Sequence, residues 1–586
     1  MHPPNRRQFV HSAAAALFGA PALLAQPRRP PNVIVLLTDD QGYGDFACHG
    51  NPLLKTPNID RIHGESVRFT DFHVAPMCTP TRGELLTGVD ALRNRATSVT
   101  AGRAVVRRDI PIMSDYFAQS GYSTGLFGKW HVGDNFPYRP MDRGFQESVY
   151  FLGWGLSSAP EFDNDYFDGR YRHRGAVKQF PGYCTDFWFS QAMDWMGQQS
   201  AKRQPFFCYL PTNVPHGPQW VDPRYSDPYR RKGVPAEFFG MIANADENVG
   251  RLDEFLSKSG LRENTIVVFM TDNGGTAGVN FYNAGMRGRK TQYWEGGHRV
   301  PCFIRHPAGK FGAPRDVTGV SQIQDILPTM IDLCDLKRLP SPVPHDGTSL
   351  APALRDSKKA LPDRTVVVQY GQHLKPFDCC VAQGRWRLVG RDELYNLDTD
   401  FAQANNVAAQ NPEVLARLRG RYEKWWEGVE PLTRGFLPIS IGSSRENPVM
   451  LSSSDWQDIY LDNHRTVSAG DGGAEGGPWT IRVESSGTYE ISLARWPFER
   501  ALALDAPCPE KKMRVAVLPA GKALPIAGAR LRVGSHDLSA KTKPGDLSAS
   551  FTVKLSAGPP STMHGWFLDG AGAGICGAYY AKVRTV

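Results

Sequence analysis

The chain lacks several features that would place it in common classes of protein. Beyond the N-terminal region no segment is long and apolar enough to span a membrane. No run of lysine and arginine with interleaved aromatic residues indicates nucleic-acid binding. The ten cysteines form no CxxC pair and no zinc-ribbon spacing, and no repeat of solenoid or propeller period is visible. We therefore expect neither a membrane anchor nor a nucleic-acid partner.

The length and composition are those of a soluble globular protein with more than one core. Single hydrophobic cores stop growing at roughly 250–300 residues, and this chain has 586. Hydrophobic residues make up 41% and charged residues 22% of the chain, which are ordinary values. The net charge of +8 is compatible with an anionic substrate but does not require one.

The N-terminus predicts export. Arg6-Arg7 precedes an apolar run from Ala13 to Leu24, with small residues for cleavage near Ala22 or Ala25. We interpret residues 1–25 as a twin-arginine signal peptide, which makes the twin-arginine export machinery a partner and the location bacterial, periplasmic or secreted. An amphipathic tail is the alternative. Twin-arginine substrates fold in a reducing compartment, which argues against disulfides, and we interpret the adjacent Cys379-Cys380 as core.

From about residue 31, apolar runs alternate with helical patterns, which predicts an α/β domain over residues 26–360 with a large, mostly parallel sheet flanked by helices. Four runs are each followed by polar residues: 33–38 by Asp39-Asp40, 123–128 by Lys129 and His131, 206–210 by His216, and 266–271 by Asp272-Asn273. Because ligands bind at the carboxyl ends of such strands, these residues form a site if the strands are neighbours. Otherwise they only mark where the chain meets water.

The sequence also predicts the helices and loops of the α/β domain and two further regions on its C-terminal side. Helical spacing appears at 111–120, 190–199 and 238–259, whereas residues 135–180 show no period and are predicted as long loops over the site. Residues 361–440 predict a small antiparallel sheet with one helix at 412–426. A Ser-, Pro- and Gly-rich linker follows at 435–455, and short strands over 441–586 predict an accessory β-sandwich-like domain. We assign its tryptophans to packing rather than to a sugar-binding face: Trp456, Trp479, Trp496 and Trp566.

Two groups of residues indicate chemistry. Asp39, Asp40, Asp272 and Asn273 offer only oxygen ligands, which suit Ca²⁺ or Mg²⁺ rather than zinc. Separate strand-end turns are the alternative, since Asp-Asn-Gly-Gly is a good turn sequence. Cys78 precedes Pro80 at the predicted start of a helix, with Arg82 one turn further on the same face. This arrangement indicates an anion site or a reactive thiol, or else a structural cysteine.

Cys78-Thr-Pro-Thr-Arg82 resembles the Cys-x-Pro-x-Arg motif of the sulfatase family, within the alkaline-phosphatase-like superfamily. The resemblance, which is to bacterial arylsulfatases, extends from residue 33 to about 430, and every motif stands in the family's order. The other matching segments are Thr38-Asp-Asp-Gln-Gly-Tyr-Gly-Asp45, Gly128-Lys-Trp-His-Val-Gly133, Pro215-His216, Thr271-Asp-Asn-Gly-Gly275, Arg287-Gly-Arg-Lys290 and Trp294-Glu-Gly-Gly-His-Arg-Val-Pro301.

The resemblance implies a role for each matching residue. A formylglycine-generating enzyme would oxidise Cys78 to formylglycine (3-oxoalanine), whose hydrate attacks sulfur. The metal ligands would be Asp39, Asp40, Asp272, Asn273 and the modified residue 78, for calcium in preference to magnesium. Arg82 and Lys129 would hold the hydrate, and His131 would take its remaining proton to expel sulfate. His216 would protonate the leaving oxygen, with Lys290 beside the sulfate.

We also expect His298 and Arg299 to lie near the site as substrate contacts. The predicted reaction is hydrolysis of a sulfate monoester on a sulfated carbohydrate or an aryl sulfate. Two alternatives remain: a formylglycine-dependent phosphodiesterase or phosphonate hydrolase, and an inactive protein that binds sulfated glycans. A zinc phosphatase is disfavoured, because that branch uses Ser or Thr as nucleophile and more histidine ligands.

Overall fold

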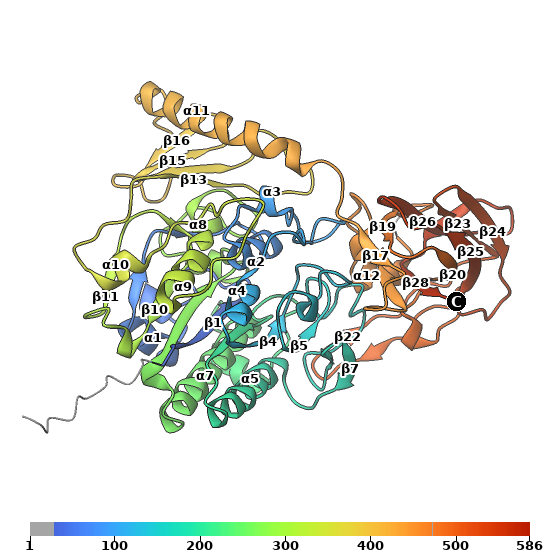
Figure 1. The fold of residues 1–586 in the computed structure, drawn as a ribbon, viewed down its shortest axis with the longest axis horizontal. Helices are drawn as coiled ribbons and strands as arrows, with labels where there is room; N and C mark the ends of the chain where they lie inside the picture. The colour runs from blue at the N-terminus through green and yellow to red at the C-terminus, as the bar shows by residue number, and fades with distance from the viewer. Residues whose placement is uncertain (1–28, 472) are drawn as a thin grey trace, which may run out of the picture.

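The computed structural model describes residues 29–471 and 473–586, so the predicted signal peptide lies outside the described residues. A ten-stranded sheet forms the centre, in the order β11-β2-β10-β9-β1-β8-β4-β5-β6-β7 (Figure 1). Its strands are β1 (Asn32–Thr38), β2 (Val67–Phe69), β4 (Ser123–Lys129), β5 (Glu147–Phe151), β6 (Arg170–His173), β7 (Ala176–Gln179), β8 (Phe206–Pro211), β9 (Thr265–Thr271), β10 (Cys302–Arg305) and β11 (Arg315–Val317). No helix in these ranges is both long and apolar enough to cross a membrane.

The central strand β1 is covered on both faces by helices. Val33, Val35 and Leu37 belong to one buried cluster, and Ile34 and Leu36 to another on the opposite face. A strand buried on both faces is apolar at every position, which explains the continuous hydrophobic run in the sequence. The first face packs α2 (Cys78–Thr87), α4 (Met113–Gln119) and α9 (Ile326–Cys334), and the second packs α1 (Pro57–Gly64), α5 (Cys184–Ala201) and α7 (Ala236–Lys258), as Figure 1 shows.

Four neighbouring strands, β9, β1, β8 and β4, run parallel to one another. These are the four apolar runs that the sequence singled out, so their carboxyl ends do share one edge. The prediction of long loops over 135–180 was wrong in part. β5 pairs parallel to β4, and β6 and β7 extend the sheet as an antiparallel edge. The last two have only four residues each, β6 half-buried and β7 exposed, so they carry no apolar pattern that the sequence would reveal.

A small antiparallel sheet with one helix follows, as predicted. It consists of β13 (Thr365–Val368), β14 (Cys380–Gln383), β15 (Trp386–Val389) and β16 (Glu393–Asn396), covered by α11 (Pro412–Val429). Cys379 and Cys380 are buried in this part, and each of the ten cysteines is unpaired in the described chain.

The C-terminal region is a β-sandwich, also as predicted (Figure 1). One sheet contains β17 (Ile439–Ile441), β19 (Trp479–Val483), β23 (Gly528–Val533), β24 (His536–Lys541), β26 (Ser561–Leu568) and β27 (Gly574–Gly577). The other contains β18 (Val449–Ser452), β20 (Gly487–Ala494), β25 (Ala549–Leu555) and β28 (Tyr580–Thr585). The predicted linker at 435–455 therefore already contributes β17 and β18. Trp456, Trp479, Trp496 and Trp566 are buried, which excludes an exposed sugar-binding face made of them.

A buried arginine joins the small sheet to the α/β part. Arg387 on β15 is fully buried, and its guanidinium donates to Glu295 (2.7 Å) and Asp71 (2.7 Å). Burial opposes the charge of Glu295, yet Arg387 and His73 lower the pKa of this carboxyl to about 2. Its stabilising contribution is therefore fully present above pH 4.5, the ordinary value, and is lost as the pH falls towards 2.

Arg387→Met should destabilise the protein by about 3–5 kcal/mol at pH 7, because two buried carboxylates lose their counter-ion. The deficit should shrink as the pH falls towards 4, since the freed carboxylates then take up protons. Thermal unfolding at several pH values measures both effects. Arg385→Met, at an exposed arginine two residues earlier, is the matched control and should change stability by no more than about 0.5 kcal/mol. Equal melting temperatures for the two variants at pH 7 would contradict the role of Arg387 as the stabilising counter-ion of Glu295 and Asp71.

Candidate active site

The polar residues gather where the four parallel strands end. Asp39 follows β1, Lys129 is the last residue of β4, and Asp272 follows β9, whereas His216 lies in the loop after β8. Asp39, Lys129 and Asp272 are fully buried, and His216 is half-buried. The strand register therefore brings together residues that are more than 200 positions apart in the sequence.

Cys78 occupies the first position of helix α2, as the motif predicted. Met77 before it is extended, and Pro80 fits the first turn because a proline there gives up only an amide that has no helical partner. The Cys78 Sγ lies 3.4 Å from Asp39 Oδ1 and 3.4 Å from Lys290 Nζ. Burial raises the pKa of this thiol, so the unmodified side chain is a poor nucleophile.

Three acidic and three basic side chains surround Cys78 in pairs. Lys129 Nζ lies 2.5 Å from Asp39 Oδ2, Arg82 Nη2 lies 2.8 Å from Asp272 Oδ2, and Lys290 Nζ lies 2.5 Å from Asp40 Oδ1. Although burial favours the neutral acid, Lys129 and His216 hold the pKa of Asp39 well below its usual value. Burial and the nearby Asp39 instead raise the pKa of Asp272 to about 7. The three carboxylates and the three cations balance in formal charge, and Asp272 is the one carboxyl of the three whose pKa is raised.

The same residues fit a hard metal ion. One ligand atom from each of Asp39, Asp40, Cys78 and Asp272 lies within 4.8 Å of the others. The Oδ1 atom of Asn273 is buried and has no hydrogen-bond partner among the described residues, while its Nδ2 donates to Asp40 Oδ1 (2.9 Å). An unpaired amide oxygen beside three carboxylates is a suitable additional ligand for Ca²⁺ or Mg²⁺.

The two histidines each present one free ring nitrogen to the site. His131 Nε2 lies 2.8 Å from the Val99 carbonyl and must donate to it, which leaves the buried Nδ1 as an acceptor without a partner in the described chain. Burial and Lys129 hold the pKa of His131 well below its usual value. His216 Nδ1 lies 2.6 Å from the Gly217 carbonyl, so its Nε2, 3.8 Å from Asp40 Oδ2, faces the acidic group.

Two residues that the sequence reading missed support His216. The Trp154 ring packs against the His216 ring with 5.6 Å between centroids, and its Nε1 donates to Asp462 of the C-terminal region (3.1 Å). The buried Asp462 also accepts from Thr100 (2.7 Å). Neither residue stands in a recognisable motif, and the pair is separated by 308 positions, so no pattern in the sequence could have indicated this contact.

The expectation for His298 and Arg299 does not fit the structure. His298 is fully buried, with one ring nitrogen 2.9 Å from His73 Nδ1 and the other 3.1 Å from the Tyr293 carbonyl. Arg299 donates to Glu295 and to the Thr70 carbonyl. Both belong to the buried polar group around Arg387, because the short helix α8 (Glu295–His298) turns them towards the small sheet. We therefore leave them out of the proposed substrate site.

Comparison with known proteins identifies the family. The model of the sulfatase family matches residues 31–336 of the 586. N-acetylgalactosamine-6-sulfatase of Mus musculus is 28% identical over 66% of this chain and 78% of its own length. Arylsulfatase G of Mus musculus is 30% identical over 55% of this chain and 69% of its own length. The crystal structure of Ps i-CgsB is 27% identical, with a TM-score of 0.62 over 70% of this chain and 95% of that one. Because the family model covers more than half of the chain, this protein belongs to the sulfatase family and is a sulfuric ester hydrolase.

Proposed function

We propose that this sulfatase hydrolyses a sulfate monoester on a carbohydrate, with Cys78 converted to formylglycine as the nucleophilic residue and Ca²⁺ as the metal. The observation that carries the proposal is the position of Cys78, buried at a helix N-terminus between Asp39 and Lys290. An unmodified thiol with a raised pKa gains nothing from that position, whereas an aldehyde hydrate could use the acceptors and cations around it.

Each group would act on one part of the reaction. A formylglycine hydrate supplies one hydroxyl to attack sulfur and a second through which sulfate is later expelled. A bound Ca²⁺ would neutralise charge on the oxygens of the sulfate group. Arg82 and Lys129, already fixed by Asp272 and Asp39, would orient the side chain at position 78, and Lys290 would stabilise the charge that develops on the sulfate oxygens.

The histidines would move the protons. His131 Nδ1 is a buried acceptor close to Lys129, in the state needed to take a proton from the remaining hydroxyl. Burial lowers the pKa of His216, but an arriving sulfate ester brings negative charge that favours the protonated ring. His216 Nε2 would then donate to the leaving oxygen. Trp154 packs against this ring, and Asp462 fixes the indole of Trp154 by a hydrogen bond.

The carbohydrate assignment rests on similar proteins. Relatives named N-acetylgalactosamine-6-sulfatase match about three quarters of their length or more. The 27% identical Ps i-CgsB has been solved in complex with k-i-k-neocarrahexaose. We also propose twin-arginine export to the periplasm or the medium, supported by Arg6-Arg7 and the apolar run after it, and maturation by a formylglycine-generating enzyme.

The first test is the mass of the tryptic peptide from Phe69 to Arg82, from protein made in a host that has the formylglycine-generating enzyme. A mass that corresponds to formylglycine at position 78, with activity on a sulfate ester and none on the matching phosphate diester, is the expected result. Protein from a host without that enzyme is the control and should retain the thiol. An unmodified thiol in both preparations would contradict the mechanism and favour a glycan-binding protein.

Calcium should stabilise the protein by about 2.7 kcal/mol at one hundred times its dissociation constant, because it binds only the folded site. Thermal unfolding with chelator and then with excess CaCl₂ measures this, with NaCl of equal ionic strength as the control and MgCl₂ as the competing cation. Asn273→Ala removes one proposed ligand without changing the charge, and should reduce the calcium-dependent shift. An unchanged shift in this variant would exclude Asn273 as a ligand.

A further inference from the structure

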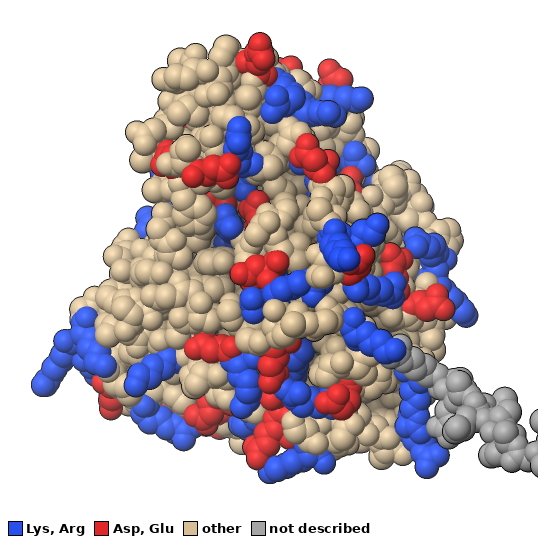
Figure 2. All heavy atoms as spheres, turned by 90° about the vertical axis from the view of Figure 1, so that its left-hand side faces the viewer, with Lys and Arg blue, Asp and Glu red and all other residues tan. Residues whose placement is uncertain are grey.

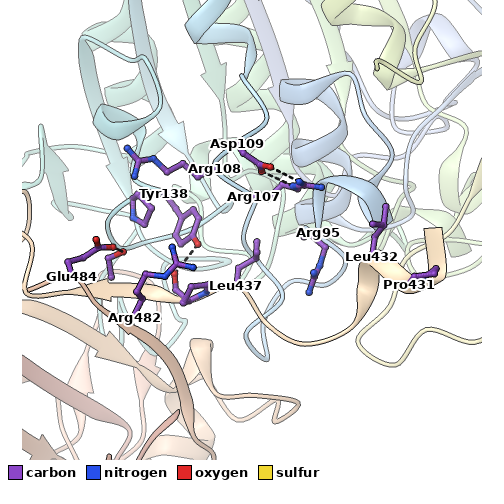
Figure 3. A pocket seen from close by; sticks show the side chains of 13 residues that line it. Arg95, Arg107, Arg108, Asp109, Tyr138, Pro431, Leu432, Leu437, Arg482 and Glu484 are labelled. Carbon is purple, nitrogen blue, oxygen red and sulfur yellow. Dashed lines mark hydrogen bonds and ion pairs between the residues drawn. The ribbon is translucent and has the colours of Figure 1, made fainter. Parts of the chain in front are cut away.

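A basic groove lies where the α/β part meets the C-terminal sandwich. Its cavity of about 770 Å³ falls within the range typical of ligand sites, roughly 300–1,000 Å³. Figure 3 shows side chains from four stretches of the chain around it: the loop that carries Arg95, Arg107 and Arg108, the pair Pro137 and Tyr138, the segment 431–440, and strand β19 with Arg482. The residues of the proposed active site, including Cys78, do not line this cavity.

The groove carries positive charge that its own acids do not neutralise. Arg107 donates two hydrogen bonds to Asp109 (2.7 and 2.5 Å) and is fully paired. Arg95, Arg108 and Arg482 have no carboxylate partner in the described part of the chain. The other lining acid, Glu484, accepts a hydrogen bond from Ser440 (2.5 Å). Three unpaired guanidinium groups therefore face one concave site.

The contacts of Arg95 show how the fold accommodates the excess positive charge in the groove. Its Nη2 donates to the carbonyls of Arg434 (3.0 Å) and Gly435 (2.7 Å), which hold the guanidinium in place without supplying a negative charge. Partial burial and the neighbouring Arg103 and Arg107 lower the pKa of Arg95 to about 10. By contrast, basic and acidic side chains are interspersed on the face of the molecule shown in Figure 2.

We propose that this groove binds the sulfate groups of a polyanionic carbohydrate at a distance from the active site; this inference rests on the proposed carbohydrate substrate. A guanidinium offers a planar fork of donors that matches the oxygens of a sulfate group, and it is weakly hydrated. Leu432, Leu437 and Pro438 provide apolar surface beside the arginines, on which the carbon face of a sugar ring can pack.

The residues that line the groove disfavour the binding of single-stranded nucleic acid. Binding of single strands usually needs exposed aromatic rings on which bases stack. The aromatic side chain of the lining, Tyr138, is buried, and its hydroxyl donates to the Pro438 carbonyl (2.9 Å). The ring is therefore part of the wall and offers no free face for stacking.

The groove is connected to the proposed active site through one loop. The loop that carries Arg95 and Arg108 also contains Val99, whose carbonyl accepts from His131 Nε2 (2.8 Å). A polymeric substrate bound in the groove would thus be retained close to the proposed active site. The groove should lower the KM for polymers and leave the turnover of small esters unchanged.

The test compares Arg108→Glu/Arg482→Glu with a control of equal charge change, Lys358→Glu/Lys359→Glu. All four side chains are exposed, and neither lysine has an ion-pair partner in the described chain. Both double variants are made in full-length protein that also carries Cys78→Ala, which prevents turnover. Binding of fluorescent dextran sulfate, unsulfated dextran and single-stranded DNA is measured by anisotropy, and thermal unfolding verifies that each variant is folded.

The arginine variant should bind dextran sulfate about tenfold more weakly than the parent, equivalent to about 1.4 kcal/mol, whereas the lysine control should stay within about twofold. Unsulfated dextran should not bind. Equal affinities of the two double variants would overturn the proposal, and tight DNA binding that the arginine variant loses would overturn the carbohydrate assignment.

A second readout separates this proposal from the proposed function. With Cys78 intact and converted, the arginine variant should hydrolyse 4-nitrophenyl sulfate as the parent does, while its KM for a sulfated polysaccharide rises. Absence of hydrolysis by the parent would refute the enzymatic proposal and leave the binding result standing. An unchanged KM for the sulfated polysaccharide would refute the proposal that the groove binds this substrate.

Discussion

The balance of buried charge at one edge of the central sheet is the constraint on which the rest of the structure depends. Asp39, Asp40 and Asp272 are buried and pair with Lys129, Lys290 and Arg82, respectively. Removing one member of a buried ion pair typically costs several kcal/mol, so the geometry must be supplied by rigid elements. Four adjacent parallel strands and the N-terminus of α2 provide it, because their positions are fixed by two hydrophobic layers.

Two features indicate that this group serves a reaction and not only the stability of the fold. Asp272 has a raised pKa, and Asn273 Oδ1 has no hydrogen-bond partner among the described residues, as is common where polar groups are arranged for a reaction. The polar group around Arg387 provides the contrast. There Glu295 and Asp71 have lowered pKa values and direct guanidinium partners, and the group connects two parts of the fold.

The C-terminal sandwich packs directly against the part of the chain that carries the proposed active site. Its core includes Ala159 and Phe162 from the loop after β5, and Asp462 reaches the indole of Trp154 beside His216. The basic groove is likewise lined from both parts. A region that fixes Trp154 beside His216 and lines a second cavity is well placed to influence which substrates are bound.

The sequence by itself determined the residues whose signals are local. β1, β8 and β9 appear as nearly continuous apolar runs because each is buried on both faces, and the start of α2 follows from Pro80. The preference of the proposed site for a hard cation also follows from the sequence, since Asp39, Asp40, Asp272 and Asn273 offer oxygen donors. Only the tertiary structure decided that His298 points into a structural network, that Trp154 meets Asp462, and that Arg95, Arg108 and Arg482 share one groove. The physical reason is that these contacts join segments far apart in the sequence through tertiary packing, which leaves no periodicity or spacing along the chain.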